Sequence, residues 1–328
     1  MKTALILGIS GQDGAYLARF LLEKGYTVVG GSRDAQITPF SNLIQLGIRD
    51  RVALESVSLN DFRSVIQILR KIQPDEIYNL AGQSSVGLSF EQPVETLESI
   101  TFGALNLLEA IRFNSKATKL YNAGSSECFG NLPDDPADEQ TPFRPRSPYA
   151  VAKAAAFWEV ANYREAYGLF ACSGILFNHE SPLRPLRFVT RKVIAAACRI
   201  ANGSDERLQL GDLSIARDWG WAPDYVEAMW LMLQQGAPED FVIATGQTCS
   251  LQDFVETAFS QLNLDWRGHV DTDTGIARPN ELRVSRGNPE KAHRQLGWKA
   301  THTMVDVIRM MARSEAASSE PGTEKVSR

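Results

Sequence analysis

Residues 4–22 read ALILGISGQDGAYLARFLL, and this stretch decides the fold class. Four apolar residues are followed by a glycine turn with the spacing GxxGxxG, built on Gly8, Gly11 and Gly14, and then by helical periodicity. Strand, glycine turn and helix form the context of a dinucleotide-binding loop, where N–H groups at a helix N-terminus meet a pyrophosphate. The generic fingerprint is GxGxxG, so an ordinary strand–turn–helix corner is the alternative.

Apolar runs alternate with helical segments through the first half of the chain. The pattern predicts strands at residues 3–7, 27–30, 52–57, 76–80, 119–123 and 171–176. It predicts helices at residues 12–24, 61–72, 93–113 and 147–167. Strands separated by helices indicate βαβ units. The predicted fold class is therefore α/β, with a doubly wound parallel Rossmann sheet and a smaller C-terminal α/β portion that binds substrate.

The alternation loosens after about residue 178. Helices are expected at residues 188–201, 223–235, 251–262, 289–296 and 303–312, with strands at 208–210 and 241–244. From residue 314 the chain is rich in Ser, Glu, Gly and Lys without periodicity, which is typical of disorder. The predicted organisation is a NAD(P)-binding Rossmann domain (1–177), a mainly substrate-binding portion (178–313) and a disordered tail (314–328).

Composition narrows the class of protein. The chain has 328 residues and a formal net charge of −5, which gives no electrostatic footprint for nucleic acid. No apolar run is long enough to span a membrane, and no signal peptide precedes the first strand. The four cysteines and four histidines lack paired or ligand spacing, so we expect neither a disulfide framework nor a metal site. The sequence predicts a cytoplasmic protein.

The second predicted strand ends in Gly30-Gly31-Ser32-Arg33-Asp34. An acidic residue at this point binds the adenosine ribose, whereas an arginine accommodates a 2′-phosphate. Glycine in the acidic position followed by Arg33 favours NADP. Asp34 leaves NAD as the alternative cofactor, and Arg33 as a solvated loop residue is a further alternative.

Tyr149 and Lys153 lie four residues apart in the predicted helix 147–167, so their side chains share one face. An ammonium beside a phenol favours the phenolate and lowers the tyrosine pKa from about 10, which makes a general base. Ser125 and Glu127 follow the predicted strand 119–123 at the carboxyl edge of the sheet, where ligands of such sheets bind. For Glu127 alone, a solvated strand-end carboxylate is the alternative.

With these residues in place, the chain resembles the extended short-chain dehydrogenase/reductases, and within them the GDP-mannose 4,6-dehydratase family. The resemblance rests on the segments 8–17 (GISGQDGAYL), 146–153 (RSPYAVAK), 162–165 (NYRE), 174–182 (GILFNHESP) and 217–220 (RDWG). It runs from the N-terminus to about residue 312. It implies a lyase that converts GDP-mannose to GDP-4-keto-6-deoxymannose and assembles as a homo-oligomer, a dimer or tetramer.

The resemblance also implies four catalytic roles. Tyr149 takes the proton from the mannose C4 hydroxyl while a hydride passes to the nicotinamide. Lys153 lowers the tyrosine pKa and holds the nicotinamide ribose, and Ser125 hydrogen-bonds the C4 oxygen. Glu127 removes the C5 proton, which is acidic beside the C4 ketone, and assists loss of the C6 hydroxyl as water.

By resemblance, further residues bind the two ligands. The cofactor contacts are Gly8, Ser10, Gly11, Gln12, Asp13, Gly14, Arg33, Ser58, Leu59, Leu80, Ala81, Gln83, Ser84, Tyr149, Lys153, His179 and Arg184. The GDP-mannose contacts are Ser84, Ser125, Glu127, Asn178, Lys192, Arg217, Arg278 and Glu281. Arginine forks suit a diphosphate, and a carboxylate can accept from ribose hydroxyls. A packed structural His179 and a structural ion pair of Arg217 are the alternatives.

Three other functions remain open. A dehydratase of a modified GDP-hexose or GDP-heptose would share the same catalytic residues. An epimerase or 4-ketoreductase of the same fold would have no use for Glu127. A non-catalytic cofactor-sensing scaffold would keep the glycine loop and lose Tyr149 or Lys153, whereas both are present here.

Overall fold

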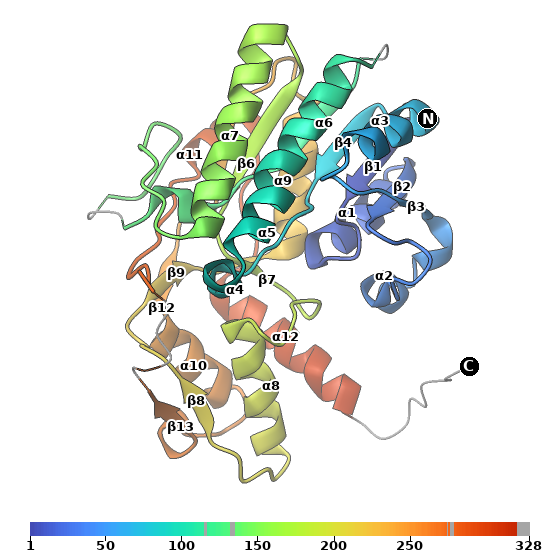
Figure 1. The fold of residues 1–328 in the computed structure, drawn as a ribbon. Helices are drawn as coiled ribbons and strands as arrows, with labels where there is room; N and C mark the ends of the chain where they lie inside the picture. The colour runs from blue at the N-terminus through green and yellow to red at the C-terminus, as the bar shows by residue number, and fades with distance from the viewer. Residues whose placement is uncertain (115–116, 132–134, 274, 276–278, 320–328) are drawn as a thin grey trace.

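Seven parallel strands form the central sheet of the computed structural model, which describes residues 1–114, 117–131, 135–273, 275 and 279–319. Their order across the sheet is β3-β2-β1-β4-β5-β6-β11 (Figure 1). The strands are β1 (Thr3–Leu7), β2 (Thr27–Ser32), β3 (Ala53–Ser56), β4 (Glu76–Asn79), β5 (Lys119–Ala123), β6 (Ala171–Leu176) and β11 (Phe241–Ile243). This order confirms the predicted doubly wound α/β fold.

Helices cover both faces of the sheet, and strands β4 and β6 are accordingly buried along their whole length. One face carries α1 (Gln12–Glu23) and α9 (Ala222–Gln234), and the other carries α3 (Phe62–Ile72), α6 (Gly103–Arg112) and α7 (Pro148–Tyr167). The predicted helix 93–113 forms as α5 (Pro93–Leu97), a π-helical turn (Glu98–Phe102) and α6 in sequence.

A smaller α/β portion has its own apolar core (Figure 1). It packs α8 (Val189–Ala201), α10 (Leu251–Ser260) and α12 (Met304–Ser319) beside the strand pair β8 (Leu208–Leu210) and β13 (Val270–Thr272). Two short ladders lie at its junction with the sheet. They pair β7 (His179–Glu180) with β10 (Gly220–Trp221), and β9 (Ala216–Asp218) with β12 (Thr248–Ser250).

Short elements complete the described chain. They are α2 (Ser41–Gln45), α4 (Val86–Glu91), α11 (Glu290–Leu296) and the 3-10 turns Arg49–Arg51, Ser126–Phe129 and Trp266–Gly268. Across the described ranges, no helix combines the length and apolarity that a membrane crossing requires.

The structure refines the predicted organisation in two places. After residue 178 the chain returns to the sheet, because β11 pairs with β6 and α9 packs on β5 and β6. The predicted tail from residue 314 is helical as far as Ser319, because Glu315 forms an ion pair with Arg191 of α8 and α12 packs on that helix. Residues 320–328 lie outside the described chain.

Candidate active site

The glycine turn lies at the carboxyl end of β1 and lines a cleft of about 730 Å³. Gly8 has a φ of +85°, and a Cβ atom there would lie 2.8 Å from the Leu80 carbonyl oxygen. A Cβ on Gly14 would lie 2.4 Å from the Gly8 carbonyl oxygen. Gly11 caps α1 without a side chain, so the first N–H groups of that helix receive no side-chain acceptor from it. The backbone geometry fits a dinucleotide cradle.

The sequence-predicted cofactor residues gather around this cleft. Its lining includes Gly8, Ser10, Gly11, Gln12, Asp13, Gly14, Arg33, Ser58, Leu59, Leu80, Ala81, Gln83, Ser84 and Arg184. Arg33 is 87% exposed at its side chain and lies 3.6 Å from Glu95. Asp34 accepts from the backbone N–H groups of Gln36 and Ile37 at 2.9 and 3.2 Å, so it stabilises its own loop.

A second cleft of about 200 Å³ adjoins the first. Both clefts are lined by Asp13, Leu80, Ser84, Arg184, Arg187 and Phe188. The predicted catalytic and substrate residues on the smaller cleft are Ser84, Ser125, Glu127, Tyr149, Lys153, Asn178, Arg217 and Glu281, and the predicted cofactor contact His179 lines it too. Glu127 and Tyr149 therefore lie on one side of the sheet, at one cavity.

Capping hydrogen bonds position two pairs of predicted catalytic residues: Ser125 with Glu127, and Tyr149 with Lys153. Ser125 follows β5, and its Oγ accepts from the Glu127 N–H at 3.3 Å as it caps the 3-10 turn Ser126–Phe129. Ser147 Oγ accepts from the Ala150 N–H at 3.1 Å and begins α7. One helical turn separates Tyr149 from Lys153, and both residues are buried.

The charge state of the phenol differs from the sequence-based expectation. Burial raises the pKa of Tyr149, and a hydrogen bond from Ser125 opposes this rise only in part. The expected lowering of the Tyr149 pKa is therefore wrong in direction. Lys153 Nζ donates to the Ala123 carbonyl oxygen at 2.7 Å and lies 5.9 Å from the centre of the Tyr149 ring. Burial lowers the Lys153 pKa to about 8.

Asp13 and His179 form an ion pair beside the shared wall of the clefts. His179 Nε2 lies 3.0 Å from Asp13 Oδ2. Burial opposes the charged form of each partner, but their attraction wins: the pKa of Asp13 falls to about 2 and the pKa of His179 rises. Arg184 is held 3.1 Å from the buried Glu180. Arg217, which is 4% exposed, lies 2.9 Å from Glu281.

One predicted substrate residue, Lys192, is not brought to the clefts, and the position of another is not described. Lys192 Nζ donates to the Gln209 carbonyl oxygen at 2.7 Å, and this residue is absent from the described lining of both clefts. Arg278 lies outside the described residues. The ligand contacts of both stay predictions.

Sequence reasoning missed Arg187 and Phe188, which line both clefts. The guanidinium of Arg187 lies 5.1 Å from the Phe188 ring centre. The sequence did offer a signal for this part of the site: Arg184 and Arg187 lie three residues apart, directly after the segment 174–182. Among the described residues, no group of three or more His, Cys, Asp or Glu side chains is arranged to hold a metal ion.

Solved structures that contain a nicotinamide cofactor have the same fold. The dTDP-glucose 4,6-dehydratase of Bacillus anthracis, in complex with NAD, matches with a TM-score of 0.84 at 19% identity over 95% of this chain and 96% of that one. The RMD protein of Pseudomonas aeruginosa, complexed with NADPH, matches with a TM-score of 0.80 at 24% identity over 97% and 100%. At these identities the likeness establishes the fold alone.

Sequence comparison establishes the family. The family model for GDP-mannose 4,6 dehydratase matches residues 5–311. GDP-mannose 4,6 dehydratase 1 of Arabidopsis thaliana is 47% identical over 320 residues, which cover 94% of this chain and 88% of the relative. The Yersinia enterocolitica GDP-mannose 4,6-dehydratase is 42% identical over 345 residues, covering 95% and 93%. These matches confirm the resemblance inferred from the motifs, and the chain belongs to the GDP-mannose 4,6-dehydratase family of lyases.

Proposed function

We propose that this chain converts GDP-mannose to GDP-4-keto-6-deoxymannose. The observation that carries the proposal is that Glu127 and Tyr149 line the same small cleft, next to the dinucleotide cradle. Oxidation at C4 needs one base, and elimination across C5 and C6 needs a second group of different pKa. A phenol and a carboxylate from different elements meet that requirement.

The nicotinamide cofactor would be held at the glycine turn and would take a hydride from C4 and give it back at C6. The proton that Tyr149 takes from the C4 hydroxyl balances the protonation of C5 in that last step. Tyr149 removes the C4 hydroxyl proton, and Ser125 donates a hydrogen bond to the same oxygen. Glu127 then takes the C5 proton, whose acidity comes from the C4 ketone, and delivers a proton to the departing C6 hydroxyl. Glu127 lies on the short turn after β5 and Tyr149 lies on α7, so the two groups reach the cleft from different elements and can act on neighbouring carbons.

NADP is the proposed cofactor, with NAD as the alternative. Arg33 lines the large cleft and is engaged by the half-exposed Glu95 at 3.6 Å, a weak contact that a 2′-phosphate can replace. Because Asp34 already accepts two N–H groups of its own loop, it is poorly placed to serve as a ribose acceptor.

The proposed assembly is a homo-oligomer, a dimer or tetramer. Helices α5 and α7 are neighbours (Figure 1), and the π-helical turn packs on both. Large apolar side chains are exposed on these three elements, including Val94, Phe102, Val151 and Trp158 at 66, 54, 44 and 62% exposure. Light scattering of the purified protein measures the mass, and a monomer would contradict this part of the proposal.

The substitution Glu127→Gln tests the chemistry. The variant should still reduce added NADP on mixing with GDP-mannose, but formation of the 4-keto-6-deoxy product should fall by about 10²–10⁴-fold. Tyr149→Phe is the matched control and should fail at both steps. Unchanged product formation by Glu127→Gln would refute the mechanism. Wild-type product from a C6-modified GDP-hexose but none from GDP-mannose would assign the modified sugar as substrate.

A further inference from the structure

His179 is held by two acceptors at once. Its Nε2 faces Asp13 Oδ2 at 3.0 Å, and its Nδ1 faces the Phe177 carbonyl oxygen at 2.7 Å. A carbonyl oxygen only accepts, and an ionised carboxylate also only accepts. Asp13 Oδ1 accepts in addition from Gln12 Nε2 at 3.0 Å, which favours the carboxylate form. Both ring nitrogens therefore donate, and the ring is an imidazolium.

Other charged and titratable groups surround this pair. Arg184, from the loop after β7, opposes the positive charge on the ring. Tyr225 of α9 stacks on the imidazole with ring centres 4.4 Å apart. Lys153 of α7 is close enough for Asp13 to raise its pKa. Glu180, beside His179, is paired with Arg184 at 3.1 Å. Asp13 is thus the carboxylate that sustains the imidazolium.

The pair joins the two ligand-binding sides of the molecule. Asp13 lies in the first turn of α1, at the dinucleotide cradle, and it lines both clefts. His179 begins β7 and follows Asn178, which lines the smaller cleft. Gln12 strengthens the same junction: its Nε2 donates to the His179 carbonyl oxygen at 3.2 Å, and its Oε1 accepts from Ser181 Oγ at 2.7 Å.

We propose that Asp13 is a positioning residue that acts through His179. By keeping the imidazole protonated it fastens the cofactor turn to the segment that carries Asn178, and so sets the distance between the reacting sugar and the nicotinamide. The inference rests on the proposed function for its effect on turnover. Its structural part, a persistent imidazolium, holds whatever the substrate is.

Nitrogen-15 NMR of histidine-labelled wild-type protein tests the structural part without an activity assay. The chain has four histidines, so the spectrum is simple, and His179→Gln identifies the signal by its loss. The His179 signal should keep the imidazolium pattern well above the ordinary pKa of about 6.5. If His179 titrates at about 6.5 or below, the proposal is overturned.

The substitution Asp13→Asn tests the functional part. An amide does not sustain the positive charge, so the His179 pKa should fall towards its ordinary value. At about pH 8 the ring is then neutral, and kcat should drop about tenfold or more because a misplaced reactant is costly. Turnover should recover at about pH 6 as the ring regains its proton. The KM for GDP-mannose should change far less than kcat. A pH profile parallel to that of the wild type would overturn the proposal.

Asp224 offers a matched control, because it also pairs with a histidine. Its carboxylate lies 3.1 Å from His302 Nδ1, and neither residue is in the described lining of the clefts. Asp224→Asn should lower stability and leave the pH profile of kcat unchanged. An equal change of profile in both variants would assign the effect to stability and overturn the proposal. If wild-type protein fails to turn over GDP-mannose, the proposed function falls, and the NMR titration still decides the state of His179.

Discussion

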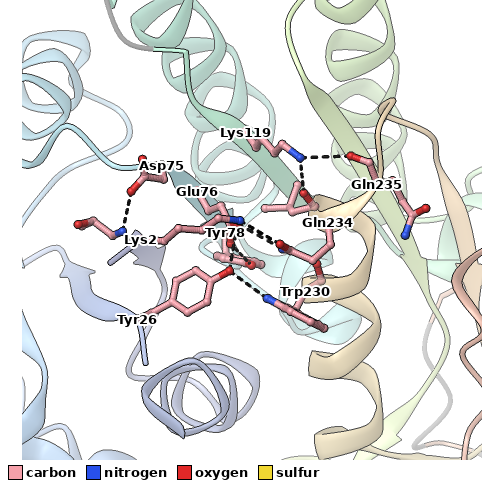
Figure 2. Close-up of polar contacts among 11 residues, drawn as sticks. Lys2, Tyr26, Asp75, Glu76, Tyr78, Lys119, Trp230, Gln234 and Gln235 are labelled. Atoms are coloured by element: carbon pink, nitrogen blue, oxygen red, sulfur yellow. Dashed lines mark hydrogen bonds and ion pairs between the residues drawn. The ribbon is translucent and has the colours of Figure 1, made fainter. Parts of the chain in front are cut away.

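The amino and carboxyl edges of the central sheet both bury ionisable side chains but satisfy them differently. At the amino edge, Glu76 begins β4 and is 1% exposed. Its carboxylate accepts from Lys2 Nζ at 2.8 Å, Tyr78 Oη at 2.8 Å and Tyr26 Oη at 3.2 Å (Figure 2). Gln234 of α9 donates to the same group at 3.2 Å. Internal donors therefore saturate this carboxylate.

At the carboxyl edge, Lys153 has more hydrogen-bond donors than assigned acceptors among the described residues. The Lys153 ammonium has three donors, and among the described residues its one assigned hydrogen bond is to the Ala123 carbonyl oxygen. Burial costs this ammonium its hydration, which is why its pKa falls to about 8. The amino edge therefore contributes to stability. The carboxyl edge keeps donors for a ligand, and this costs the protein some stability.

Replacing Tyr149 with Phe should have the largest effect. The phenol is the proposed base at the carboxyl edge, so its removal should lower kcat by about 10³-fold, equivalent to about 4 kcal/mol. Thermal unfolding should hardly change, because the aromatic ring and its packing remain. A comparable loss of stability would mean that the phenol also fastens the fold, and the contrast between the edges would fail.

Replacing Glu76 with Leu should have the next largest effect. Tyr78 is fully buried and loses its acceptor, while Lys2, half exposed, can turn to water. We expect the free energy of unfolding to fall by about 3 kcal/mol, measured by urea denaturation, with kcat of the folded enzyme unchanged. Glu76→Gln keeps the shape and two polar groups and serves as the control, with about half that loss. If kcat falls under conditions where the variant is fully folded, Glu76 also affects catalysis, and the contrast between the two edges is wrong.

Replacing Lys153 with Met should change stability less than Glu76→Leu does, and in the opposite direction. The wild-type ammonium is penalised by burial, so the variant should be about 1 kcal/mol more stable at neutral pH, although the Ala123 carbonyl loses its donor. The folded pKa of about 8 lies below the ordinary 10.5. Wild-type stability therefore rises with pH between these values, and the advantage of the variant should disappear there. Turnover should be lost. A destabilised variant below pH 8 would show that Lys153 supports the fold.

Long, regular features of the sequence predicted the structure well. The bounds of β1, β5 and β6 agree with the predicted ranges 3–7, 119–123 and 171–176. The ladders β7–β10 and β9–β12 were missed because two or three residues carry no measurable periodicity. The return of the chain through β11 was missed for a related reason: residues 241–244 read as a strand, but nothing local assigns its partner.

Site residues could be predicted where they lie at the end of a predicted strand or at the start of a predicted helix. Ser125 and Glu127 follow a strand, and Tyr149 and Lys153 lie one helical turn apart, so the sequence placed all four at one edge. Their roles stay predictions. The pKa of Tyr149 was expected in the wrong direction because burial is a tertiary property. The hydrogen-bonded cluster around Glu76 could not be predicted from the sequence, because its members Lys2 and Gln234 are 232 residues apart.

The pairing of β11 with β6 has an evolutionary consequence. The last strand of the cofactor sheet and its covering helix α9 are encoded inside the C-terminal half. A fragment that stops at residue 177 would leave β6 as an exposed edge strand, and such edges promote aggregation. An exchange of whole C-terminal halves between relatives would therefore also replace a strand and a covering helix of the central sheet.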